Sequence, residues 1–131
     1  MFQAFRRDDR GTAAIEFGLV LPLLVVILVG IIDYGNVYFT RLAMTNAARE
    51  GARVGVTKNE ADAQGAAVAA TNAYLAQAGI DADVASTAPS QSNPTVTVTV
   101  TMDPYEPLIG LVPTPSRLTV STSMRWELAS P

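Results

Sequence analysis

The chain has 131 residues, of which 49% are hydrophobic and 16% charged, and its formal net charge is −3. This length leaves room for one modest domain, and without a concentrated basic surface the protein is not expected to bind nucleic acid. The sequence contains no Cys and no His, which removes thiolate nucleophiles, imidazole bases and most zinc and haem sites. We therefore expect no catalytic residue, no cofactor, no metal site and no enzymatic activity.

The first predicted element is an apolar helix that crosses a membrane. From Thr12 to Ile32 the only charged residue is Glu16. A helix of about 20 residues matches the hydrocarbon thickness of a bilayer. The alternative, a buried core helix of a soluble protein, is disfavoured because so small a domain cannot surround it. We expect a transmembrane helix over residues 12–35.

Charge before the apolar run predicts its orientation. The run is preceded by three arginines: Arg6, Arg7 and Arg10. They predict a cytoplasmic N-terminus, with the rest of the chain on the far side of the membrane. Small residues, beginning with Gly11 and Thr12, precede the apolar core and do not follow it, so cleavage behind the run is not expected. This order favours a cut in front of the run, with residues 1–11 as a leader.

Two residues within the run call for an explanation. A carboxylate in hydrocarbon costs about 2.5–3.5 kcal/mol, so Glu16 either lies at headgroup depth or is neutralised. A cut after Gly11 would place a new α-amine on Thr12, and an amine of an adjacent subunit can pair with the Glu16 carboxylate during assembly. Pro22 lacks an N–H and is expected to kink the helix, although proline is also generally common in membrane helices.

Beyond the membrane, the helix is predicted to continue as a stalk up to a break at Lys58-Asn59. Small side chains recur along this stalk at four-residue spacing: Ala43, Ala47, Gly51 and Gly55. Such a stripe allows close approach by another helix or a sheet. The charged residues Arg49, Glu50 and Arg53 are expected to be solvated, in preference to forming an ion pair between subunits.

A second, Ala-rich helix is predicted for "EADAQGAAVAATNAYLAQAG", with Asn59 as its N-cap and Gly79 as its C-terminal stop. The composition then changes to Val, Thr, Ser and Pro, and strands are predicted at "ADVAST", at residues 95–102 and at residues 117–126. The valines that alternate in the middle strand are expected to face the helices: Val96, Val98 and Val100. The predicted fold class is α+β, with a small antiparallel sheet covering the stalk.

The connection "DPYEPLIGLVPTPS" between the last two strands is unusually apolar for a loop. Its apolar members are Tyr105, Leu108, Ile109, Leu111 and Val112. Packing against its own sheet is the favoured interpretation, and a contact surface for neighbouring subunits is the alternative. Trp126 is expected to anchor the core in preference to binding a ligand.

The segments "RGTAAIEFGLVLPLLVVILVGIIDYG" and "AMTNAAREGARVGV" resemble the N-terminal region of TadE-like pseudopilins, minor pilins of the bacterial tight adherence (Tad) pilus. In that family, and in type IV-like pilins generally, a prepilin peptidase cleaves after a Gly on the cytoplasmic face, and a Glu occupies the fifth mature position. Counted from Thr12, Glu16 is the fifth residue, and Phe17 follows it. The resemblance is densest over residues 10–56.

The resemblance implies a minor pilin or pseudopilin that is cleaved between Gly11 and Thr12 and acts in pilus assembly, surface adhesion and biofilm formation. Its implied partners are the prepilin peptidase, the major pilin, other minor pilins, the inner-membrane assembly platform and membrane lipid. The expected location is the bacterial inner membrane, with residues 36–131 as an extracytoplasmic pilin-like domain that can enter a surface pilus. The alternative is a permanently anchored extracytoplasmic adaptor of a secretion system that never enters a filament.

Overall fold

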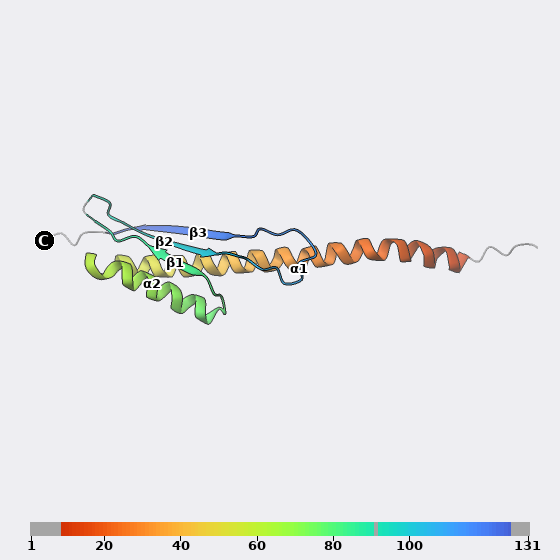
Figure 1. Ribbon diagram of the computed structural model, residues 1–131, viewed down its shortest axis with the longest axis horizontal. Helices are drawn as coiled ribbons and strands as arrows, with labels where there is room; N and C mark the ends of the chain where they lie inside the picture. The colour runs from red at the N-terminus through yellow and green to blue at the C-terminus, as the bar shows by residue number, and fades with distance from the viewer. Residues whose placement is uncertain (1–8, 91, 127–131) are drawn as a thin grey trace, which may run out of the picture.

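The computed structural model describes residues 9–90 and 92–126. Its elements in chain order are α1 (Asp9–Val56), α2 (Glu60–Gln77), β1 (Asp83–Ser86), β2 (Thr95–Met102) and β3 (Leu118–Arg125). In Figure 1, α1 forms a rod along the long axis, and α2 and the sheet lie only along its C-terminal half. This arrangement confirms the predicted α+β class with a long N-terminal helix, a second helix and a small antiparallel sheet.

Helix α1 is a single helix of 48 residues. It runs through Pro22 and past Ile32 without a break and ends at Val56, so the predicted continuation of the membrane helix as a stalk is confirmed. Residue 35, the expected end of the membrane segment, therefore lies within a continuous helix. It lies near the point where the exposed apolar part of α1 meets the folded domain. The kink at Pro22 stays a prediction.

Helix α2 begins and ends where its capping residues predict. The Asn59 side chain accepts a hydrogen bond from the backbone N–H of Asp62 at 3.0 Å, which satisfies a free donor of the first turn. At the other end, Gly79 has a positive φ of 68°, and the N–H of Ile80 donates to the Leu75 carbonyl at 3.0 Å. This is a Schellman-type stop, in which glycine adopts the left-handed conformation at little cost.

The three strands form one antiparallel sheet in the order β1-β2-β3. In the central strand Val98 lies opposite Ser86 on one side and Thr122 on the other. Its alternating valines are fully buried, as expected: Val96, Val98 and Val100. On the outer face, the hydroxyls of Thr97 and Ser123 share a hydrogen bond of 2.8 Å across β2 and β3. The alternation thus directs one face of the sheet onto the helices.

The core lies between the C-terminal half of α1, α2 and the inner face of the sheet. Most of its helical members are alanines, and Met44 is its largest fully buried side chain. Trp126 packs against the edge of this core, and its indole N–H donates to the Lys58 carbonyl at 2.9 Å, just beyond the end of α1. Trp126 therefore contributes to the core, as expected, and does so from its edge.

Candidate functional site

The N-terminal half of α1 is an exposed apolar rod. Every residue from 11 to 28 is exposed. Within the described residues, α1 is the one helix that is long and apolar enough to cross a membrane, and its most apolar stretch is not buried by any other part of the protein. An apolar surface of this length needs a non-aqueous partner, and lipid or a neighbouring apolar helix supplies one.

The residues of the predicted processing site lie at the start of this rod. The Gly11–Thr12 bond falls in the first turns of α1, and Gly11, Thr12 and Glu16 are all exposed. Pro22 is exposed six positions after Glu16. The leader arginines Arg6 and Arg7 lie outside the described residues. The Glu16 carboxylate is therefore accessible to a partner from outside the protein.

The small residues of the stalk lie in the fold's own interior. Ala43, Ala47, Gly51 and Gly55 are all buried. A Cβ atom built on Gly51 would overlap the hydroxyl oxygen of Thr71 and lie 2.7 Å from the Ala67 carbonyl oxygen, both on α2.

Gly55 is similarly crowded, by α2 and the sheet together. A Cβ atom there would lie 3.0 Å from both the Ala67 Cβ and the Val96 Cγ1. The two glycines therefore let α2 and β2 approach the stalk closely. Because they are buried in this way, they are not available as a packing surface for a neighbouring subunit.

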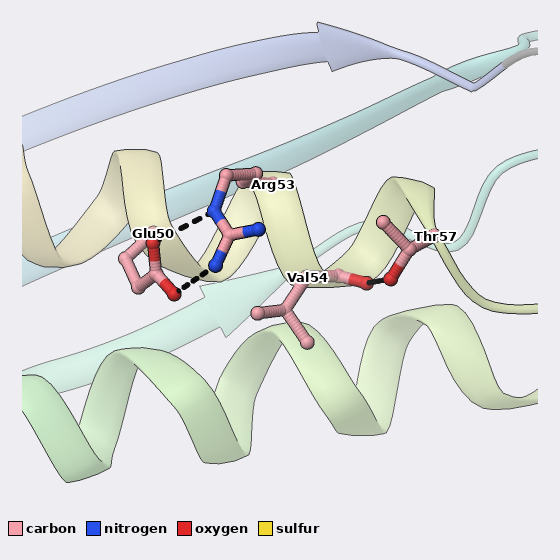
Figure 2. Close-up of polar contacts among 4 residues, drawn as sticks. All are labelled: Glu50, Arg53, Val54 and Thr57. Carbon is pink, nitrogen blue, oxygen red and sulfur yellow. Dashed lines mark hydrogen bonds and ion pairs between the residues drawn. The ribbon is translucent and has the colours of Figure 1, made fainter.

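The charged residues of the stalk remain at the surface, and two of them form a pair within α1. Figure 2 shows the Arg53 guanidinium against the Glu50 carboxylate, with contacts of 2.9 Å from Nε and 2.6 Å from an Nη. This hydrogen-bonded pairing lowers the pKa of Glu50 and raises that of Arg53. One turn later, the Thr57 hydroxyl donates to the Val54 carbonyl at 2.7 Å near the helix end. Exposed pairs of this kind contribute little to stability.

A second polar site lies where the apolar rod meets the folded domain. The Asp33 carboxylate, which is 0% exposed, accepts hydrogen bonds from the backbone N–H groups of Ile109 at 2.9 Å and Gly110 at 3.1 Å. Both donors belong to the connection between β2 and β3. In Figure 1 this dark blue connection extends past the end of the sheet along α1 toward its orange section.

Further hydrogen bonds hold the same connection to α1. The Tyr34 hydroxyl donates to the Pro113 carbonyl at 3.0 Å, and the Asn36 amide donates to the Tyr105 hydroxyl at 2.9 Å. At the base of the connection, the Tyr105 N–H donates to the Ser116 carbonyl at 2.7 Å. We call residues 105–116 the apolar loop. Its ends are close together, as in a compact surface loop.

The apolar loop corrects one sequence-based expectation. Its tip was expected to pack against its own sheet, and for three residues this is wrong: Leu108 is 69% exposed, Ile109 50% and Leu111 61%. Tyr105 alone of the apolar set is buried with the core. The physical reason is that Asp33 on α1 holds the backbone of the loop past the end of the sheet (Figure 1).

Asp33 is the residue that the sequence interpretation missed. No role was predicted for it, although a carboxylate directly after an apolar run of membrane length is costly and calls for a partner. The signal was the position of this carboxylate, together with the uncharged stretch from Pro107 to Ser116 that supplies the donors. What the sequence did not contain was the pairing between two segments 76 residues apart.

An acidic hollow lies beside the start of β1 and the end of β2. It has a volume of about 280 Å³ and is lined in part by Asp81, Asp83 and Asp103. Asp103 is already paired with Arg117. Within the part of the chain that the structure describes, no group of three or more His, Cys, Asp or Glu residues is arranged to hold a metal ion.

Comparison with known proteins finds a similarity in the N-terminal part of the chain. Residues 11–53 match the family model described as TadE-like protein. Searches of curated proteins and of solved structures find no match to the chain. The matched residues contain the whole exposed apolar rod, Glu16, Asp33 and most of the stalk.

Proposed function

We propose that the protein is a TadE-like minor pilin of the Tad pilus whose precursor is cleaved by a prepilin peptidase between Gly11 and Thr12; the match of residues 11–53 to the TadE-like family model supports this proposal. Its work is assembly and involves no catalysis. Its partners are the peptidase, the major pilin, other minor pilins and the assembly platform of the inner membrane. The cellular outcome is surface adhesion and biofilm formation.

The observation that carries this proposal is the exposed apolar half of α1, which projects from a compact domain. In a bilayer, lipid covers this rod, and the subunit stays in the membrane until it is assembled. In a filament, the apolar helices of neighbouring subunits take the place of lipid. One surface thus serves both states, because both environments exclude water from the same side chains.

Glu16 would position each subunit as it moves from the lipid into the filament. Cleavage after Gly11 creates an α-amine on Thr12, and the exposed Glu16 carboxylate of one subunit can pair with the amine of the next. Pairing removes the cost of a lone charge in hydrocarbon. An incorrectly positioned subunit would leave both charges unpaired in the same apolar surroundings, which disfavours it.

Sequencing the N-terminus of the protein purified from membranes tests the proposal. In cells with an active prepilin peptidase we expect the sequence to begin at Thr12, and in peptidase-deficient cells at Met1. An intact Met1 in both strains would overturn the cleavage. A Gly11→Leu variant is the matched control, because it blocks the expected cut while leaving the apolar run unchanged.

Shearing the cell surface distinguishes the pilin from a resident adaptor. We expect the mature protein to co-purify with sheared Tad filaments and to be enriched over an inner-membrane marker. Recovery only in the membrane fraction, from cells that still make filaments, would favour the permanently anchored adaptor.

A further inference from the structure

We propose that the apolar loop, residues 105–116, is a second membrane contact: its tip enters the lipid interface beside α1 on the extracytoplasmic side. The inference needs α1 to cross a bilayer but does not need the protein to enter a pilus. The site it assigns is a lipid-binding tip composed of Leu108, Ile109 and Leu111.

The depth of the loop along α1 is the first argument. A Cβ atom on Gly30 would lie 3.6 Å from the Val112 side chain, and Asp33 holds the next turn of the loop. Gly30 is two residues before Ile32, the end of the apolar run, and two residues are about 3 Å of helix. The loop therefore reaches the level at which the hydrocarbon begins.

The chemistry of the loop is the second argument. No charged residue occurs from Pro107 to Ser116, and three of these ten residues are prolines: Pro107, Pro113 and Pro115. Proline carries no N–H and so presents no donor that needs a partner. Non-helical backbone tolerates membrane depth only where its polar groups are satisfied. Here Asp33 satisfies two N–H groups and Tyr34 one carbonyl.

The same contacts explain why a carboxylate stands at the lipid boundary. Asp33 is fully buried and receives both of its hydrogen bonds from the loop. Without the loop it would face the headgroup region with neither donor. The loop makes Asp33 tolerable and Asp33 holds the loop at this depth, so the two features form one unit.

The exposed side chains of the loop are the third argument, because the loop that carries them is bound to α1 at the end of its exposed apolar part. Leu108, Ile109 and Leu111 are all exposed, and the exposed Tyr34 of the helix donates a hydrogen bond to the Pro113 carbonyl of the same loop. Tyrosines are enriched at the membrane–water interface, and apolar side chains that enter it penetrate about 5–10 Å. Lipid is the occupant that this position beside the apolar part of α1 favours over a second protein.

Site-specific labelling of the full chain tests the inference. The protein has no cysteine of its own, so a Leu111→Cys variant can carry one environment-sensitive nitrobenzoxadiazole dye. The labelled protein is reconstituted in phosphatidylcholine vesicles with or without brominated phosphatidylcholine. Ile27→Cys, in the apolar rod, is the positive control, and Ser123→Cys, on the outer face of β3, is the negative control. All three sites are exposed, so labelling leaves the core intact.

Two brominated lipids are compared, one with bromine near the headgroup and one with bromine deep in the acyl chain. We expect the Leu111 dye to lose at least half of its emission with the first lipid and a smaller fraction with the second. The Ser123 dye should change by less than a tenth. Quenching at Ile27 but not at Leu111 would overturn the lipid contact while leaving the anchor in place. A Leu111 dye that is shielded from aqueous iodide yet not quenched by lipid would overturn it in favour of a second protein. No quenching at Ile27 would show that α1 does not cross the bilayer, and both the inference and the proposed anchor would fail.

Discussion

Asp33 and Ile109 are 76 residues apart in the sequence and are joined by a hydrogen bond of 2.9 Å from the Ile109 N–H to the Asp33 carboxylate. A second bond comes from Gly110 to the other carboxylate oxygen, at 3.1 Å. One buried side chain on the long helix thus determines where a distant loop lies. This link places the apolar loop at the point where the exposed rod meets the folded domain.

Removing the Asp33 carboxylate should release the apolar loop. An Asp33→Ala variant leaves two donors without acceptors, a loss of about 1–3 kcal/mol for each buried group. We expect the amides of Ile109 and Gly110 to exchange with deuterium about 10- to 100-fold faster in detergent micelles, and Asp33→Asn to be intermediate because it retains one acceptor oxygen. Glu106→Ala, in the same loop but exposed, is the control. Unchanged exchange in Asp33→Ala would contradict this role.

The close approach of α1 and α2 should depend on the missing side chain at position 51. Gly51→Ala introduces a Cβ atom into the Thr71 hydroxyl and near the Ala67 carbonyl, and overpacking of this kind costs about 1–3 kcal/mol. The matched control is Gly65→Ala on α2, where a Cβ atom meets nothing within 4 Å. That change should stabilise the helix by about 0.5–1 kcal/mol.

Denaturant unfolding in micelles, followed by the emission of the single Trp126, measures both glycine variants. Trp126 reports docking because its indole N–H bonds the Lys58 carbonyl at 2.9 Å. The two substitutions should move the midpoint in opposite directions. Equal stabilisation by both would mean that the helices can separate at Gly51 without cost.

Glu16 should matter for assembly and not for membrane insertion. A Glu16→Ala variant removes a carboxylate that costs about 2.5–3.5 kcal/mol in hydrocarbon when it is unpaired, so insertion should be equal or better. Recovery in sheared filaments should fall at least tenfold, because the pairing with the neighbouring amine is lost. Glu60→Ala, an exposed carboxylate at the start of α2, is the control. Normal filament recovery for Glu16→Ala would contradict the charge-pairing proposal.

The Glu50–Arg53 pair should give a small dependence of stability on pH. The hydrogen bond from Arg53 lowers the pKa of Glu50 in the folded protein. A lowered carboxyl pKa contributes stability above the unfolded-state pKa of about 4.3, and that contribution disappears as the pH falls through the lower folded value. Because both groups are exposed, we expect a slight effect.

Comparing wild type with Glu50→Gln at pH 7 and pH 3 tests this dependence. The difference in unfolding midpoint should be small and in favour of wild type at pH 7, and it should shrink at pH 3. A difference that grows on acidification would contradict the sign derived from the pairing. High salt should reduce the difference at pH 7, since exposed charges are screened.

Local patterns were sufficient to predict the elements of the fold. Asn59 and Gly79 delimit α2 because capping depends on neighbouring residues alone. The alternation in β2 predicted which face is buried, since side chains of a strand alternate by geometry. The absence of a helix breaker predicted that the membrane helix continues into the stalk, as α1 does.

The candidate site was predictable only in part. Gly11, Thr12, Glu16 and Pro22 were identified from spacing along one segment, and their roles await the experiments above. The stripe from Ala43 to Gly55 was recognised as a surface for close approach, but sequence spacing did not say which element approaches it. The structure assigns α2 and β2 to Gly51 and Gly55.

The sequence by itself determined the long apolar helix, the caps of the second helix and the face of the sheet that turns inward, because each depends on residues within a few turns or along one strand. Only the tertiary structure decided that Asp33 holds the apolar loop and that Leu108, Ile109 and Leu111 remain exposed. The physical reason is that these features depend on where the chain crosses itself after the core has formed. Periodicity describes each segment's own faces, whereas a contact across 76 residues is set by how all the segments pack together.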